Sequence, residues 1–164
     1  YSNTFLGEIK KGNASIELIN KLHVSLLQEM SLVAEVVLQK ELDYFKKNEQ
    51  NCYQQFIKTT SLLLATKYPV LDKTLKRIVN NYLKHIQNIF SNFSKDITLI
   101  LKSFSIKENK NIIIKDIDTS LGDGHSGEST ALVTLSNGTK LIYEPRNIDV
   151  GNSYNLFVNW VNQK

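Results

Sequence analysis

The sequence contains only one cysteine and two prolines in 164 residues, and it has no long apolar run. Cys52 cannot form an internal disulfide, and with no second cysteine nearby it offers no zinc-ligand spacing. This usage favours a reducing compartment, so we expect a cytoplasmic protein. No segment approaches the roughly 18 consecutive apolar residues of a membrane-spanning helix, and we therefore expect no membrane span.

The formal net charge of +4 comes from lysines spread along the whole chain, such as Lys10, Lys46, Lys73 and Lys84. A nucleic-acid surface would need clustered arginines and interleaved aromatic side chains. We therefore interpret the lysines as solvated helix faces and expect no nucleic-acid partner. An acidic or phosphorylated partner stays open.

The chain begins at Tyr1, with neither an initiator methionine nor a secretory signal pattern. Its length suits one domain or two subdomains. We expect it to be one part of a longer protein.

Apolar residues recur at helical spacing up to about residue 104, which predicts a helical segment over residues 1–104. Asn13 can cap a long helix from about 14 to 46. A second helix is predicted over 52–65 and a third over 70–103, with Pro69 forcing a turn between them. His23 and His85 lie within these helices without a second ligand type nearby, so we interpret both as structural or exposed.

From residue 105 onward short β-branched runs alternate with turn residues. Strands are predicted over 112–118, 129–135 and 139–144, with a turn at Ser136-Asn137-Gly138, because Asn-Gly is a strong hairpin signal. An amphipathic helix is predicted over 151–163. The fold class expected is α+β: an N-terminal helical bundle, then a small antiparallel sheet and a C-terminal helix over residues 105–164.

A glycine-rich loop, Gly122-Asp123-Gly124-His125-Ser126-Gly127, lies between the first two predicted strands. Glycines adopt positive φ and let successive amides approach phosphate oxygens, although such a loop can equally be a simple turn. Its spacing matches neither the P-loop nor the dinucleotide fingerprint. Asp123 and His125 form a pair suited to proton transfer; alternatively Asp123 only stabilises the turn and His125 is solvated.

Strand, glycine-rich loop, strand, tight turn and third strand is also the order of a kinase N-lobe. The stretches 122–127, 131–146 and 157–162 together resemble the dehydratase domain of LanM-type (class II) lanthipeptide synthetases. Tyr68-Pro69-Val70-Leu71 before a long helix is similar to the segment that precedes this motif in the family. The resemblance extends from about Tyr68 to Asn162 and is faint before it.

In that family the dehydratase resembles a lipid kinase in fold. It phosphorylates Ser and Thr of a ribosomally made precursor peptide with ATP and Mg²⁺, then eliminates the phosphate to leave dehydroamino acids. The resemblance implies active-site roles for Asp123 and His125 in phosphate positioning and elimination. The nucleotide-binding residues that it implies are Gly122, Gly124, Ser126, Gly127, Glu144 and Arg146.

Glu144 departs from the family pattern Tyr-Lys-Pro-Arg, because the sequence here is Tyr143-Glu144-Pro145-Arg146. A lysine would pair with phosphates, whereas a carboxylate repels them, a difference of several kcal/mol at about 4 Å. Lys140 lies on the same strand face but roughly 13 Å away, which makes it a poor substitute. Arg146 offers partial compensation.

The family's C-lobe, with its catalytic Asp and Asn and its Mg²⁺ ligand, and its zinc cyclase domain have no counterpart in these residues. We therefore expect the precursor peptide with its leader, the C-lobe and the cyclase as partners, no metal ligand here, and no tightly bound ATP. Three hypotheses stay open: part of an active dehydratase, the same fold with impaired ATP chemistry kept for peptide binding or scaffolding, and an unrelated helical interaction module carrying a hairpin. A sheet of three consecutive antiparallel strands over 112–144 is the expectation on which the family resemblance depends.

Overall fold

The computed structural model describes residues 14–48, 53–106, 112–122, 127–146 and 149–163. The chain divides into two compact units, residues 1–91 and 92–164, which are described separately below. The division falls within one long helix, whereas the boundary expected from sequence, between residues 104 and 105, follows the change from helix to strand. That domain assignment stays a prediction.

Three helices follow the predicted pattern: α2 (Ile16–Asn48), α3 (Tyr53–Lys67) and α4 (Pro69–Ser103). Pro69 is the first residue of α4, a position where its missing N–H costs nothing. The N-terminal cap of α2 is Ser15, whose Oγ accepts a hydrogen bond from the Leu18 N–H at 3.1 Å. The prediction of Asn13 as the cap is therefore wrong, and Asn13 itself lies outside the described residues.

The core of the first unit is built from apolar side chains at helical spacing on α2 and α4. The Tyr82 hydroxyl of α4 donates a hydrogen bond to the Leu22 carbonyl of α2 at 3.1 Å. His85 is buried on the same helix, in line with a structural role. The buried apolar residues of these two helices are Leu18, Ile19, Leu22, Leu26, Ala34, Val79, Tyr82, Ile86 and Ile89.

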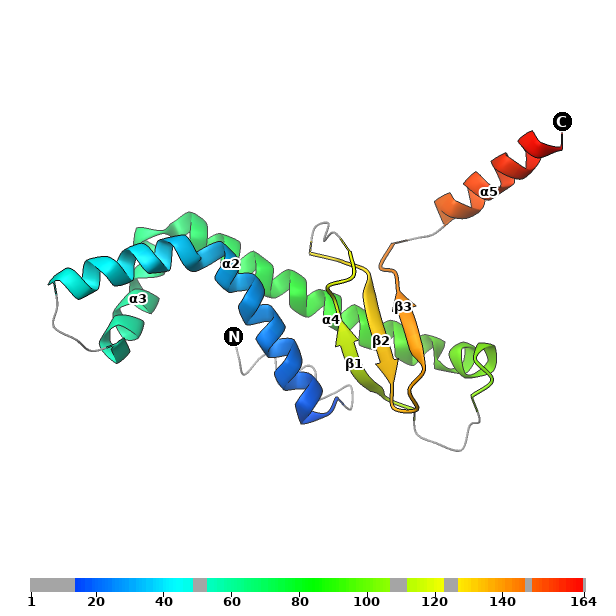
Figure 1. Cartoon of the computed structure of the whole chain (residues 1–164), viewed down its shortest axis with the longest axis horizontal. Coiled ribbons are helices and arrows are strands. Elements are labelled where there is room, and N and C mark those ends of the chain that lie inside the picture. The colour runs from blue at the N-terminus through cyan, green and yellow to red at the C-terminus, as the bar shows by residue number, and fades with distance from the viewer. Residues whose placement is uncertain (1–13, 49–52, 107–111, 123–126, 147–148, 164) are drawn as a thin grey trace. The chain divides into compact units, whose positions relative to one another are not determined.

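The second unit holds a three-stranded antiparallel sheet in the order β1-β2-β3 (Figure 1). Its strands are β1 (Ile114–Asp118), β2 (Ala131–Leu135) and β3 (Lys140–Tyr143). The predicted α+β class and the three consecutive strands are thus confirmed. The register shifts between Ile114 and Asp116, so that Ile114 and Ile117 are both buried although they are three residues apart.

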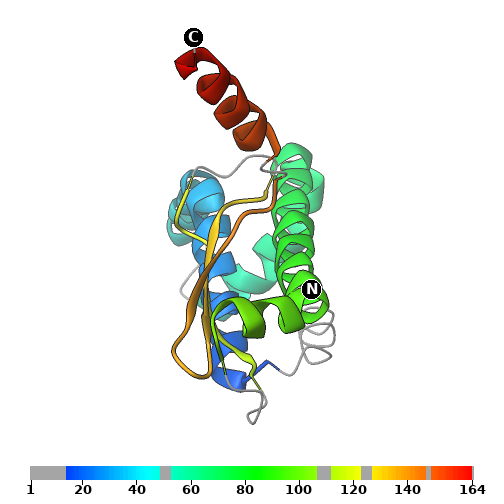
Figure 2. The same ribbon diagram turned by 90° about the vertical axis from the view of Figure 1, so that its right-hand side faces the viewer.

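The β2–β3 hairpin closes through the predicted Asn-Gly turn, visible at the lower end of the sheet in Figure 1 and nearly edge-on in Figure 2. The Gly138 N–H donates to the Leu135 carbonyl at 2.9 Å, and the Asn137 side chain accepts from the Thr139 N–H at 3.0 Å. Gly138 has a φ of 87°, which the turn needs and glycine supplies without strain.

The last element is α5 (Asp149–Asn162), which begins two residues before the predicted helix. Its apolar side chains Tyr154, Leu156, Phe157 and Trp160 are exposed. Within the described ranges, none of the helices combines the length and apolar character that crossing a membrane requires.

Candidate functional site

The predicted site residues divide into two groups. Asp123, Gly124, His125 and Ser126 lie outside the described residues, so their predicted roles stay untested. Gly122, Gly127, Glu144 and Arg146 are described. Since the sheet is antiparallel, the end of β1, the start of β2 and the end of β3 lie at one end of it, opposite the Asn-Gly turn. The glycine-rich loop and the stretch from Tyr143 to Arg146 therefore share that end.

Hydrogen bonds close the base of the loop on both limbs. On the entering limb, Asp118 Oδ1 accepts from the Ser120 N–H at 3.0 Å and from the Ser120 hydroxyl at 2.6 Å, an Asx-type turn. On the returning limb, the Ser129 hydroxyl donates to the Thr119 carbonyl at 2.9 Å. These bonds fix where the loop leaves and rejoins the sheet.

The two described glycines of the loop have different roles. Gly127 has a φ of 83°, as predicted for a glycine of this loop, and a side chain there would be strained. Gly122 is not among the residues with positive φ. A Cβ built on Gly122 would lie 3.6 Å from Thr130 Oγ1, an ordinary contact distance, so the space beside this residue could hold an alanine side chain.

Glu144 is hydrogen-bonded to Thr130. The Thr130 hydroxyl donates to Glu144 Oε2 at 2.8 Å. Ala131 pairs with Tyr143, so Thr130 and Glu144 extend the β2–β3 pairing by one step beyond the ladder. This hydrogen bond joins the returning limb of the loop to the end of β3.

Sequence reasoning missed Thr130, although a signal was present. Leu135 and Thr139 face each other across the turn, and counting outward from this pair places residue 130 opposite residue 144. Hairpin register is fixed by turn type, so the pairing could have been derived from the Asn-Gly turn alone.

Tyr143 points to the other face of the sheet. Its hydroxyl accepts a hydrogen bond from Asn92 Nδ2 of α4 at 3.1 Å. Burial raises the pKa of the Tyr143 hydroxyl above its usual value. Because side chains alternate along a strand, Tyr143 ties the strand to α4 while Glu144 faces away from that helix.

Two exposed cations flank this segment. Arg146 follows β3 at the loop end of the sheet. Lys140 lies at the other end of β3, on the same face as Glu144 and opposite Thr134. Of these two cations, Arg146 is the one at the loop end of the sheet, and its role in nucleotide binding stays a prediction.

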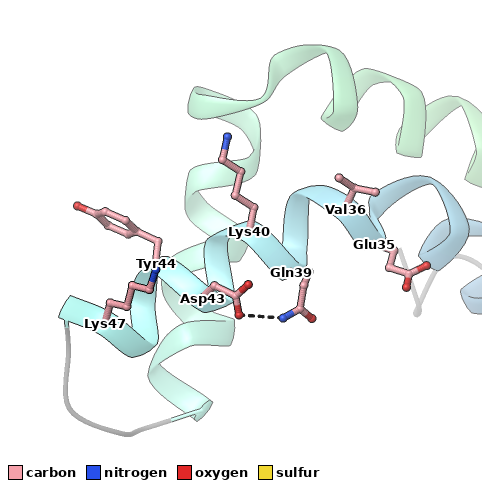
Figure 3. Close-up of a pocket in the computed structure, with 7 residues that line it drawn as sticks. All are labelled: Glu35, Val36, Gln39, Lys40, Asp43, Tyr44 and Lys47. Carbon is pink, nitrogen blue, oxygen red and sulfur yellow. Dashed lines mark hydrogen bonds between the residues drawn. The ribbon is translucent and has the colours of Figure 1, made fainter.

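Two grooves elsewhere on the surface contain none of the predicted site residues. The one in Figure 3, about 600 Å³, is lined by α2 residues alone, with a Gln39–Asp43 hydrogen bond of 2.9 Å across it. A second, about 720 Å³, follows the first half of α4 and carries Lys73 and Arg77. Among the residues that the structure describes, no group of three or more His, Cys, Asp or Glu side chains is placed to hold a metal ion.

Comparisons with known proteins place these features in context. A family described as a domain of unknown function, DUF4135, matches residues 68–164, which include the loop and the stretch from Tyr143 to Arg146. The chain is also 27% identical over 150 residues to the lacticin 481/lactococcin biosynthesis protein LcnDR2 of Lactococcus lactis subsp. lactis. That match covers 92% of this chain but 15% of the relative. The predicted resemblance to LanM-type lantibiotic synthetases is thereby confirmed.

Proposed function

We propose that this chain, which belongs to the DUF4135 family, takes part in lanthipeptide biosynthesis as part of a peptide dehydratase. The similarity to a lacticin 481/lactococcin biosynthesis protein supports this role. Since the chain spans 15% of that relative, we assign the reaction to a whole synthetase and a contributing role to these residues.

One observation carries the proposal. The glycine-rich loop and the Tyr-Glu-Pro-Arg stretch are about fifteen residues apart, yet the Thr130–Glu144 hydrogen bond of 2.8 Å joins the loop's returning limb to this stretch. These are the two segments whose combination is specific to the family. In kinases a glycine-rich loop between two antiparallel strands covers the phosphates, so the convergence of the two segments at one end of the sheet supports the proposal.

The residues at this end fit the phosphates of a nucleotide. Gly127 has a positive φ, a backbone conformation that occurs in anion-binding turns. Arg146 supplies a cation after β3, and guanidinium groups bind phosphate in a two-pronged geometry. We propose that ATP with Mg²⁺ supplies the phosphoryl group, with the Mg²⁺ ligands in a C-lobe beyond these residues. Within this chain, Gly122, Gly124, Ser126, Gly127 and Arg146 would hold the nucleotide.

Asp123 and His125 are the proposed catalytic residues. An imidazole titrates near neutral pH, and a neighbouring carboxylate orients it, so the pair suits the proton transfers of phosphate elimination. The substrate proposed is the Ser and Thr side chains of a precursor peptide with its leader, in the bacterial cytoplasm. A zinc cyclase domain would then add cysteine thiols to the dehydroamino acids.

A second candidate function rests on Glu144, which stands where the family pattern has lysine. A carboxylate there weakens phosphate binding if it faces the nucleotide. The chain would then be a catalytically impaired kinase-like module serving peptide binding or scaffolding. Family membership leaves no support for the third hypothesis, an unrelated helical interaction module.

Mass spectrometry of a cognate precursor peptide separates the two candidates. The peptide is incubated with the full-length synthetase, Mg²⁺ and ATP, beside a Glu144→Lys variant and a control, Glu35→Lys, at an exposed position of α2. Loss of water or addition of phosphate by the unaltered protein supports the dehydratase. Modification only after Glu144→Lys supports the impaired module, and no modification by any variant contradicts the dehydratase.

A further inference from the structure

We infer that Glu144 is a positioning residue for the returning limb of the glycine-rich loop (residues 127–130), which it holds through Thr130, and that it does not act as a direct phosphate contact. This inference rests on the proposed function, because the loop is taken to cover a nucleotide. It changes what the departure from the family lysine means: the carboxylate fixes the returning limb of the loop.

The hydrogen bond is directional and of ordinary length. Thr130 Oγ1 donates to Glu144 Oε2 at 2.8 Å, the usual distance for a hydroxyl donor and an oxygen acceptor. A lysine at position 144 is a donor without an acceptor atom, so it cannot receive this hydrogen bond. With lysine the direction would have to reverse, with the ammonium donating to Thr130 Oγ1, so the hydroxyl proton of Thr130 would lose the acceptor that Glu144 provides.

The hydrogen bond acts at the place where it can order the loop. Thr130 is the residue immediately before β2, and Glu144 is the residue immediately after β3. Backbone pairing of the two strands ends at Ala131 and Tyr143, so the side-chain bond continues the hairpin one step further. Without it, the returning limb would lose its tie to β3.

The hydrogen bond also affects the entering limb of the loop. Ser129, next to Thr130, holds the Thr119 carbonyl at 2.9 Å. Fixing Thr130 therefore also restrains the entering limb, through the hydrogen bond of its neighbour Ser129 to Thr119.

Glu144 is itself oriented by its neighbour in the strand. Tyr143 is bonded to Asn92 on the opposite face, which fixes the rotation of the strand at its end. Alternation then places the Glu144 side chain on the face that carries Thr130. The carboxylate is therefore directed to the loop's returning limb by the sheet geometry.

The test measures hydrogen exchange of the backbone segment 119–130 and the KM for ATP, both in the full-length synthetase. Thr130→Val and Glu144→Ala each remove one partner of the bond, while Glu144→Gln and Thr130→Ser keep an acceptor oxygen and a hydroxyl. Thr134→Val is the matched control, because Thr134 lies within β2, four residues after Thr130 and on the same face. The double variant Thr130→Val/Glu144→Ala tests whether the two residues act through one interaction.

We expect Thr130→Val and Glu144→Ala each to accelerate exchange of the segment roughly three- to tenfold, the range of a single hydrogen bond. The double variant should add little to either single change. Glu144→Gln and Thr130→Ser should stay close to the unaltered protein. The KM for ATP should rise with exchange, whereas kcat should change less, because ordering of the loop precedes the chemical step.

Equal exchange in Thr130→Val and Thr134→Val, or additive effects in the double variant, would overturn the inference. So would Glu144→Lys that lowers the KM for ATP and leaves exchange unchanged, because a direct phosphate contact would behave in that way. Accelerated exchange in a synthetase whose unaltered form neither binds nor uses ATP would keep the positioning role and contradict the proposed function, so the two failures are distinguishable.

Discussion

The Tyr82 hydroxyl donates a hydrogen bond to the Leu22 carbonyl oxygen at 3.1 Å and so joins α4 to α2. Tyr82 is only 6% exposed. Burial raises the pKa of its hydroxyl to about 12, well above the ordinary 10.0. The hydroxyl therefore stays protonated in the folded protein at pH values where it ionises in the unfolded chain.

This shift predicts a loss of stability in alkaline solution. The raised pKa means that the folded state holds the proton more tightly, so the contribution is fully present below pH 10 and is lost as the pH rises toward about 12. The loss should be on the order of 2 to 3 kcal/mol. Urea unfolding at intervals between pH 9 and 12 measures it.

Tyr82→Phe is the control for this prediction. It should cost about 1 kcal/mol at neutral pH, because one hydrogen bond is lost while the ring remains. Between pH 10 and 12, the free energy of unfolding of the variant should fall much less than that of the unaltered chain. An unchanged alkaline decline in Tyr82→Phe would assign the effect to other tyrosines.

The contacts of Glu41 predict a loss of stability in acidic solution. Its Oε1 accepts hydrogen bonds from Lys67 Nζ at 2.7 Å and from the Tyr68 hydroxyl, and its side chain is 11% exposed. These two hydrogen bonds, that from Lys67 first, lower the pKa of the Glu41 carboxyl below 4.5. The stabilising contribution is thus present above pH 4.5 and is lost as the pH falls below it.

Thermal unfolding of Glu41→Gln at pH 7 and at pH 3 tests this contribution. The variant should unfold at a lower temperature than the unaltered chain at pH 7, and the difference should shrink at pH 3. Glu35→Gln, on the exposed face of α2, should show no such convergence. A difference for Glu41→Gln that is equal at both pH values would contradict the assignment.

The positive φ of Ser105 predicts that a glycine at this position would stabilise the fold. Ser105 has a φ of 52° two residues after the end of α4. There the Ile106 N–H donates to the Leu101 carbonyl and the Ser105 N–H to the Lys102 carbonyl, the pattern of a Schellman motif. Glycine adopts this conformation without strain. Ser105→Gly should stabilise the fold by about 0.5 to 1 kcal/mol.

A matched substitution inside the helix gives the opposite sign. Ser103→Gly changes the last residue of α4, where glycine only adds freedom to the unfolded chain. It should destabilise by up to about 1 kcal/mol. Calorimetry of both variants checks the pair, and an equal sign for the two would contradict the role given to the φ of Ser105.

The two described loop glycines predict different costs. Gly127→Ala should destabilise by about 1 kcal/mol or more, because a φ of 83° is unfavourable for any side chain with a Cβ. Gly122→Ala should be nearly neutral, because its Cβ would meet Thr130 at an ordinary contact distance of 3.6 Å. Urea unfolding of the two variants side by side measures the difference, and equal costs would contradict it.

Much of the fold follows from the sequence because the responsible signals are local. The helical period up to residue 103, Pro69 at a helix start and Asn137-Gly138 at a hairpin turn each act over a few residues, and the structure has the elements that they predict. The ends of elements were less certain. Asn13 and Ser15 are both good capping residues, and only the observed start at Ile16 selects Ser15.

The candidate site was predictable in its location and less so in its interactions. The loop and the Tyr-Glu-Pro-Arg stretch were identified by composition and resemblance, and their meeting at one sheet end follows from three antiparallel strands. The roles of Asp123 and His125 stay predictions. The interpretation of Glu144 as a residue facing phosphate rests on the family motif and its charge and stays a prediction. The structure adds a hydrogen bond that the sequence reasoning missed, from the Thr130 hydroxyl to the Glu144 carboxylate.

The sequence by itself determined the helices, the strands and the tight turn, because backbone conformation responds to neighbours within one or two turns of chain. Only the tertiary structure decided that Tyr82 bonds to Leu22, that Ile114 and Ile117 are both buried, and that Glu144 holds Thr130. These relationships join residues that are distant in sequence or displaced by an irregular register. Their side chains meet only when the elements have packed, so periodicity alone does not predict them.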